Sequence, residues 1–255
     1  MGFLYNQILG IPERALLNKK ITKTFLIKNF ELTAGEKKLL NTIVDIDWLA
    51  SIKHTTVNVP ALKNDVYSYE EIQVIVCTVP DNTLKDVSAK CIELIQKYIP
   101  YQTVLIVEDN THFVINVCDK RINLNDTSKR IITKYLTTPA LSKLYKNEVT
   151  TDFFKAINFN ALDKYNLELM YKSYTNAVVQ FQTAMVTGAF DKRNARRTEE
   201  DLIHLENIDK LEKEIITLSN QVKKETQLNH QVSLNIEIQR KRHEILAIKD
   251  LLNTL

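Results

Sequence analysis

The chain has 255 residues, 44% of them hydrophobic and 25% charged, which is typical of a globular protein with a real core. Its net charge of +3 is too small to indicate nucleic-acid binding by itself. No apolar stretch approaches the ~18 residues that a membrane span requires, so we expect no membrane association and a cytoplasmic location.

The first quarter of the chain predicts strands and helices in mixed order. Residues 23–27 predict a strand. Thr33 and Glu36 form a capping box, and the helix that follows carries an apolar stripe that reaches Trp48. β-branched residues alternate over 55–59 and predict another strand.

The middle of the chain gives the clearest sheet signals. A nearly continuous apolar run over 72–79 predicts a central strand, and 84–98 predicts an amphipathic helix. Residues 103–107 and 112–117 predict a β-hairpin, and 135–140 predict an edge strand. We therefore expect an α+β fold, with a mixed or antiparallel sheet and helices packed on one of its faces.

The second half predicts helices. Residues 160–190 predict one long helix that ends at Gly188. After residue 201 the apolar residues follow a coiled-coil seam, which breaks at 225–230 and resumes in a new phase. A helical hairpin is the favoured interpretation, and one long helix with a stutter is its competitor. The expected organisation is an α+β domain (1–150), a long connecting helix (151–190), a basic linker (191–200) and the C-terminal helical hairpin or coiled coil (201–255).

Several short stretches occur in the same order as in one family of proteins. They are Ile11-Pro12, Asp47-Trp48-Leu49, Glu70-Glu71-Ile72-Gln73-Val74 and the tail from Lys224 to Asn235. On these residues, nearly the whole chain resembles the family catalogued as domain of unknown function 4391. The resemblance implies a companion of DNA methyltransferases and helicases in bacterial restriction-type, anti-phage gene clusters. It supplies no catalytic residues, and Ser233 stands where an acidic residue is expected.

The candidate enzymatic site combines Asp65 with Glu71 and Gln73. Nucleases of the restriction-endonuclease fold place an Asp and a Glu-x-Lys or Glu-x-Gln on neighbouring strands, where two acidic groups hold Mg²⁺ and a third group orients the attacking water. Glu71 and Gln73 alternate onto one face of a strand start, as this chemistry needs. The favoured alternative is a strand whose polar end meets solvent, because Asp65 lies in a predicted loop and no paired lysine follows.

A group of basic residues in the predicted linker is the candidate contact with nucleic acid. The group consists of Lys192, Arg193, Arg196 and Arg197. Contacts of this kind would be auxiliary and non-specific, because they would neutralise phosphates without reading bases. The alternative is a solvated surface beside acidic neighbours.

The remaining chemistry-bearing residues form no recognised site. Cys77, Cys91 and Cys118 lack metal-ligand spacing, and we expect buried free thiols in a reducing compartment. The five histidines show no metal-binding spacing, and no glycine-rich phosphate loop occurs. We expect no metal and no cofactor.

The candidate interaction residues lie along the C-terminal seam and at its polar break. They are Leu211, Ile215, Leu218, Val222, Gln227, Asn229, Ile238 and Ile245. Together with the resemblance, this pattern favours a non-catalytic accessory subunit of a restriction-type defence system, which docks through its C-terminal helices to a helicase or DNA methyltransferase subunit or to itself. The alternatives are a metal-dependent nuclease and an auxiliary nucleic-acid-binding module.

Overall fold

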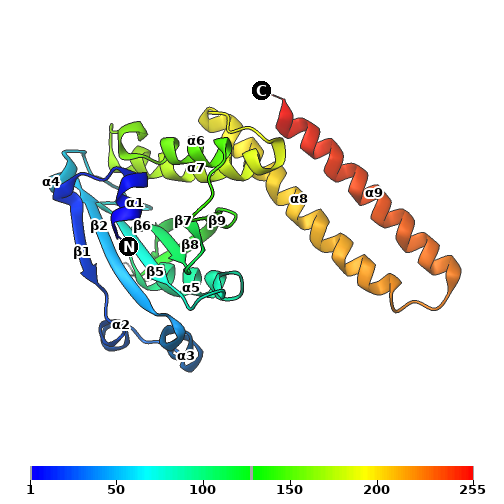
Figure 1. Ribbon diagram of the computed structural model, residues 1–255, viewed down its shortest axis with the longest axis horizontal. Helices are drawn as coiled ribbons and strands as arrows, with labels where there is room; N and C mark the ends of the chain where they lie inside the picture. The colour runs from blue at the N-terminus through cyan, green and yellow to red at the C-terminus, as the bar shows by residue number, and fades with distance from the viewer. Residues whose placement is uncertain (1, 127–128, 255) are drawn as a thin grey trace. The chain divides into compact units, whose positions relative to one another are not determined.

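The computed structural model describes residues 2–126 and 129–254 of the chain, which fall into two compact units (Figure 1). The sheet unit is Met1–Val178, and the hairpin unit is Val179–Leu255. The boundary between the two units lies inside the helix α7 (Leu167–Thr187), which continues from Val178 to Val179 without a break. Among the described residues, no helix combines the length and the apolar character needed to cross a membrane.

The sheet unit is built on a mixed β-sheet. The strands are β1 (Leu16–Lys20), β2 (Asp45–Lys53), β5 (Glu71–Thr78), β6 (Gln102–Glu108), β7 (His112–Ile122), β8 (Arg130–Thr137) and β9 (Leu141–Ser142), with β3 (Leu62–Lys63) and β4 (Ser68–Tyr69) in a separate small hairpin. The strand order is β1-β2-β5-β6-β7-β8, and β9 pairs with β7. β5 and β6 are parallel, whereas the other neighbouring strands are antiparallel. The predicted α+β class and mixed sheet are confirmed.

Helices cover both faces of this sheet. They are α1 (Gly2–Leu9), α2 (Lys23–Asn29), α3 (Ala34–Thr42), the single turn α4 (His54–Val57), α5 (Leu84–Tyr98), α6 (Glu148–Ala156) and the first half of α7. Two short 3₁₀ turns occur at Glu13–Ala15 and Phe159–Ala161.

Neighbouring residues of β7 show the two faces directly, because adjacent side chains of a strand point to opposite sides. The ring of Phe113 lies 5.4 Å from that of Tyr5 on α1 and 6.2 Å from that of Phe154 on α6, measured between ring centroids. Val114 instead belongs to the core formed with α2, α3 and α5. The sequence predicted helices on one face only. The second layer is required because β5 is buried over its length and presents apolar side chains on both sides.

Several predicted elements are confirmed. The strand over 72–79 is β5, the helix over 84–98 is α5, and the hairpin of 103–107 with 112–117 is β6 with β7. Thr33 and Glu36 form the predicted capping box at α3. Gly188 ends α7 with a positive φ of 85°. The three cysteines are free and buried, as predicted.

Other predicted elements are wrong. Residues 23–27 lie in α2, where the side chain of Thr22 caps the helix by accepting a hydrogen bond from the Phe25 N–H. The predicted strand over 55–59 contains most of the helical turn α4, which ends where Asn58 adopts a left-handed φ of 56°. The helix after Thr33 stops at Thr42, because the following apolar residues alternate with the period of β2 instead.

The predicted boundaries around the long helix also change. Residues 125–158, which carry a weak pattern, contain β8, β9 and α6. The helix predicted to begin at residue 160 begins at Leu167, after a 3₁₀ turn. Residues 195–200, predicted as part of a polar linker, belong to the helix α8 (Ala195–Val222).

A buried lysine fixes the segment between α5 and β6. Lys120 on β7 has no exposed surface, and its ammonium group donates hydrogen bonds to the carbonyl oxygens of Ile99 at 2.7 Å and Tyr101 at 2.9 Å. Burial penalises the charged form and lowers the pKa of Lys120 to about 8. The lysine therefore holds this segment at the cost of a buried charge.

We expect this cost to appear as a dependence of stability on pH. Between a folded-state pKa of about 8 and an unfolded-state value of about 10.4, the unfolded chain binds more protons, so stability rises with pH. Relative to a Lys120→Met variant, the free energy of unfolding should increase by on the order of 1–3 kcal/mol from about pH 7.5 to about pH 10. Urea denaturation of both proteins across this range measures it. A constant difference between the two proteins would contradict the assignment.

Candidate interaction site in the C-terminal hairpin

α8 and α9 (Leu228–Asn253) form an antiparallel helical hairpin (Figure 1). The chain reverses at 223–227, where the Glu225 carboxylate accepts hydrogen bonds from the N–H groups of Thr226 and Gln227 at 2.8 and 2.9 Å. The side chain of Gln231 then donates a hydrogen bond to the carbonyl of Glu225 at 2.6 Å. The hairpin predicted from the break in the seam is confirmed, and its polar residues form the turn.

The seam residues pack against one another inside this hairpin. The cluster consists of buried Ile208, Ile245 and Leu252, with Leu205, Leu211, Ile215 and Ile248 against them and Val186 added from α7. Ile238 is also buried, and Leu218 and Val222 are half-buried. The seam therefore holds α8 to α9, and little of it is left for a partner. Of the predicted interaction residues, Gln227 and Asn229 are exposed, at the turn.

One position of the seam carries a charge. Lys241 lies between Ile238 and Ile245 in the heptad spacing of α9, and only 14% of its side chain is exposed. Its ammonium group binds the carboxylate of Glu214 on α8 at 2.6 Å. Because a specific partner is required on the facing helix, this pair helps to fix the register of the two helices.

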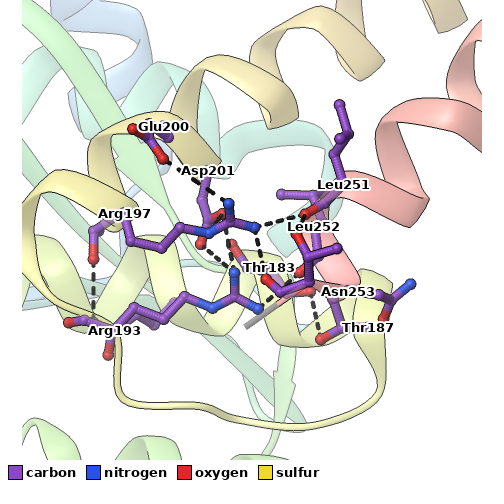
Figure 2. A network of polar contacts seen from close by, with 12 residues as sticks. Thr183, Thr187, Arg193, Arg197, Glu200, Asp201, Leu251, Leu252 and Asn253 are labelled. Carbon is purple, nitrogen blue, oxygen red and sulfur yellow. Dashed lines mark hydrogen bonds and ion pairs between the residues drawn. The ribbon is translucent and has the colours of Figure 1, made fainter.

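A buried ionic network closes the open end of the hairpin (Figure 2). Its centre is Asp201 on α8, which has no exposed surface. The guanidinium groups of Arg193 and Arg197 approach its carboxylate at 3.0 and 3.1 Å. Burial raises the pKa of the Asp201 carboxyl, and the positive charges of the two arginines oppose that shift.

The same two arginines bind the C-terminal end of α9. Arg193 donates a hydrogen bond to the carbonyl of Leu252 at 2.8 Å, and Arg197 donates to the carbonyls of Leu251 and Thr254 at 2.6 and 3.0 Å (Figure 2). The last carbonyls of a helix have no partner within the helix, and they carry its partial negative charge. The network is therefore an electrostatic clamp between the start of α8 and the end of α9.

The clamp changes the interpretation of the predicted basic linker. Arg193 and Arg197 face inward, with side chains only 5% and 23% exposed, and they have protein partners. Lys192 and Arg196 are exposed, and Arg196 pairs with Glu200 at 3.1 Å. The four basic residues expected to contact nucleic acid thus fall into two pairs. Arg193 and Arg197 bind the buried carboxylate of Asp201, whereas Lys192 and Arg196 face solvent.

An apolar strip on α9 was not predicted. Leu228, Val232, Ile236 and Leu246 are between 50% and 72% exposed. At about 100° per residue they fall, together with the exposed polar residues Gln239, His243 and Asp250, into one sector of roughly 80° on the side of the helix opposite the seam. We call these residues the outer face of α9. The sequence contained a signal for this face, because these apolar residues of α9 lie outside the positions of the seam.

The corresponding side of α8 is polar. Its residues are Glu206, Asp209, Lys210, Lys213, Thr217 and Asn220, all exposed. Two exposed isoleucines of α8, Ile203 and Ile216, lie outside this sector. The two helices of one hairpin therefore differ, because α8 has an ordinary solvated back and α9 has an apolar one.

The residues proposed for a nuclease site are held by other contacts. Glu71 and Gln73 lie at the start of β5, where the Gln73 amide donates a hydrogen bond to the Glu71 carboxylate at 2.7 Å. Their register partners on β2 are Lys53 and Ser51, and the hydroxyl of Ser51 also donates to Glu71. Asp65 is exposed between β3 and β4. Among the described residues, no group of three or more histidine, cysteine or acidic side chains is arranged to hold a metal ion.

A second buried polar cluster lies in the sheet unit, at the carboxyl ends of β5 and β6. Glu108 is 1% exposed, accepts hydrogen bonds from the hydroxyls of Tyr5 and Thr78, and forms an ion pair with Lys143. Burial and the neighbouring carboxylate raise the pKa of Tyr5. Because both carboxylate oxygens have protein partners, this cluster attaches α1 and the segment after β9 to the sheet.

The clamp should contribute strongly to the stability of the hairpin unit. Asp201→Asn keeps the shape of the side chain but leaves two inward-facing guanidinium groups without their counter-charge. We expect a loss on the order of 3 kcal/mol in the free energy of unfolding. Urea denaturation followed by the helical circular dichroism signal measures it. Asp209→Asn, which breaks an exposed pair with Lys213, is the matched control and should cost under about 0.5 kcal/mol. Equal losses in both variants would contradict the role of the clamp.

Comparisons with known proteins connect this architecture to one family. The model of the family described as "Domain of unknown function (DUF4391)" matches residues 9–245, which include the sheet, the clamp residues Arg193 to Asp201 and most of the hairpin. No curated protein and no solved structure matches the chain. Since the match covers far more than half of the residues, the chain belongs to the DUF4391 family.

Proposed function

We propose that this protein is a non-catalytic accessory subunit of a restriction-type defence complex, and that it binds a helicase or DNA methyltransferase subunit through the outer face of α9. The observation that supports this proposal most is that α9 has two apolar faces. One face is used inside the hairpin, against α8. The other carries four large apolar side chains that are at least half exposed.

The length and spacing of the outer face suit a helical partner. From Leu228 to Leu246 the strip covers 18 residue-to-residue steps, or about 27 Å at 1.5 Å per step. Val232, Ile236, Gln239, His243 and Leu246 follow one another in steps of four and three, which is the spacing of a coiled-coil seam. The polar Gln239 and His243 in its middle would select a register, as polar seam residues do.

The charges beside the outer face favour an acidic partner. Arg240 flanks it on one side and Arg242 on the other, and both are exposed. Arg240 lies 3.9 Å from the carboxylate of Glu237 and 3.7 Å from that of Glu244, which are long distances for ion pairs. A partner helix with an apolar seam and flanking carboxylates would complement this pattern, and a second copy of α9 would instead bring arginines together.

Substitutions on the outer face should abolish this association without unfolding the hairpin. The tested change is Val232→Glu with Ile236→Glu, two exposed positions. The control, Thr217→Glu with Asn220→Glu, adds the same charge to the polar back of α8. The protein would be co-expressed with the helicase and methyltransferase subunits of its own locus, and complexes would be measured by size-exclusion chromatography with light scattering.

We expect a defined complex with wild type and with the α8 control, and a loss of at least about 100-fold in affinity for the α9 variant. Circular dichroism should show unchanged helicity in both variants. A complex that survives the α9 substitutions, self-association through this face, or no complex with either subunit would contradict the proposal.

A further inference from the structure

A cavity of about 390 Å³ opens on the sheet unit, between α2, the strands β1, β2 and β5, and the segment that joins α5 to β6. Its size lies within the range of small-molecule sites in proteins. It lies on the face of the sheet that α2, α3 and α5 cover, and it is unrelated to the hairpin.

Aromatic side chains form much of the wall. Phe25 lines the cavity from α2, and Phe30 lines it from the position directly after this helix. Trp48 contributes from β2, and Tyr101 from the position directly before β6. Phe25 is 50% exposed and Tyr101 is 37% exposed, so each has ring surface left for contact with a ligand. Rings offered from several sides favour a flat ligand, because aromatic groups pack by offset stacking and by edge-to-face contact.

The polar atoms of the cavity floor are already paired. Gln73 is 1% exposed, its amide oxygen accepts a hydrogen bond from the indole N–H of Trp48 at 2.6 Å, and its amide nitrogen donates to Glu71. Ile75, two residues further along β5, is apolar and buried. The amide of Gln73 is therefore occupied by protein partners. A polar ligand group on this floor would lose its hydration without gaining a hydrogen bond from Gln73, so the part of the ligand that enters the cavity must be apolar.

The rim supplies positive charge. Lys19 and Lys20 both line the cavity and are exposed. Lys20 pairs in register with Asp47, so its side chain points to the other face of the sheet, where its ammonium group binds Asp45 at 2.7 Å. Lys19 pairs in register with Trp48 and therefore shares the face that carries the cavity. The ammonium group of Lys19, unneutralised among the described residues, lies beside an apolar cavity and favours a ligand whose exposed end is an anion.

The opposite wall is rigid. Ile99, Pro100 and Tyr101 contribute to it, and the buried ammonium group of Lys120 binds the carbonyls of Ile99 and Tyr101. The backbone of this wall is thus fixed before any ligand arrives, which reduces the entropy lost on binding.

From these observations we infer that the cavity is a binding site for a small aromatic anion, with its rings between Phe25, Trp48 and Tyr101 and its carboxylate, sulfonate or phosphate group at Lys19. Gln73, one of the residues considered for nuclease chemistry, serves in this site to orient Trp48. The inference requires no partner protein and no metal.

Trp48 is the only tryptophan of the chain and lines this cavity, so its emission responds to a molecule bound there. The probe is 8-anilino-1-naphthalenesulfonate, an aromatic anion, and its uncharged counterpart is N-phenyl-1-naphthylamine. Titration of the full-length protein should quench the emission of Trp48 and produce energy transfer to the bound anion. The uncharged analogue should bind at least about fivefold more weakly, because it lacks the attraction of Lys19.

Three variants separate the contributions of charge and rings. Lys19→Glu should lower the affinity for the anionic probe at least about fivefold and change the affinity for the uncharged probe by less than about twofold. Phe25→Ala should lower the affinity for both probes, because both lose contact with this ring. Lys28→Glu makes the same change of charge on α2 outside the cavity and should change neither. Phe25, Lys19 and Lys28 are exposed, so these variants should keep the wild-type melting temperature, which is measured alongside.

The inference would be overturned by titrations that leave Trp48 emission unchanged at saturating probe. It would also be overturned by equal binding of the two probes to wild type, or by equal effects of Lys19→Glu and Lys28→Glu. Retention of full affinity in Phe25→Ala would exclude this cavity as the place of binding.

Discussion

β5 runs between antiparallel β2 and parallel β6 with apolar side chains on both of its faces, so the sheet is stable only when helices cover both sides. The parallel pairing requires a crossover, which α5 provides on one face. On the other face, α1, α6 and the first half of α7 supply the second layer. The cavity is a consequence of the same arrangement, because Gln73 and Ile75 of β5 form its floor where α2 does not fill the space above them.

Two buried charged groups of the sheet unit bind segments that connect its strands and helices. Lys120 satisfies the carbonyls of the segment between α5 and β6, and Glu108 binds Tyr5 and Lys143 from two distant parts of the chain. Each such group has lost its hydration and is stable only with its partners in place. These clusters therefore specify where the connecting segments lie, and the apolar core alone would not.

The hairpin unit follows a different logic, because its two helices pack mainly against one another along the seam, with Val186 of α7 against the same apolar cluster. The apolar cluster provides attraction, the pair of Lys241 with Glu214 constrains the register, and the clamp around Asp201 closes the open end. All of these use one side of α9. Its outer face remains apolar and exposed, in contrast to the polar back of α8, and for that reason we propose this face rather than the seam as the surface for a partner.

The sequence by itself determined the elements whose signals are local. The continuous apolar run of β5, the amphipathic pattern of α5, the β6–β7 hairpin, the capping box at Thr33 and the reversal after Val222 all depend on residues close in the chain. Local signals failed where the same apolar residues fit both the helical period of about 3.6 residues and the strand period of 2 residues. The apolar stripe after Thr33 fits a helix as far as Trp48, but Trp48 and its neighbours pair with β5, and pairing with a distant strand outweighs helical propensity.

Only the tertiary structure decided what the polar residues do. Arg193 and Arg197 resemble a basic linker in the sequence, and they become a clamp because the folded hairpin brings the end of α9 to them, more than 50 residues away along the chain. Glu71 and Gln73 resemble part of a metal site, and they are held by Ser51 and Trp48 because β2 pairs with β5 in a register that no local pattern encodes. A charge or an amide has no preferred role until its partners are known, since its free energy depends on what replaces the water that it loses.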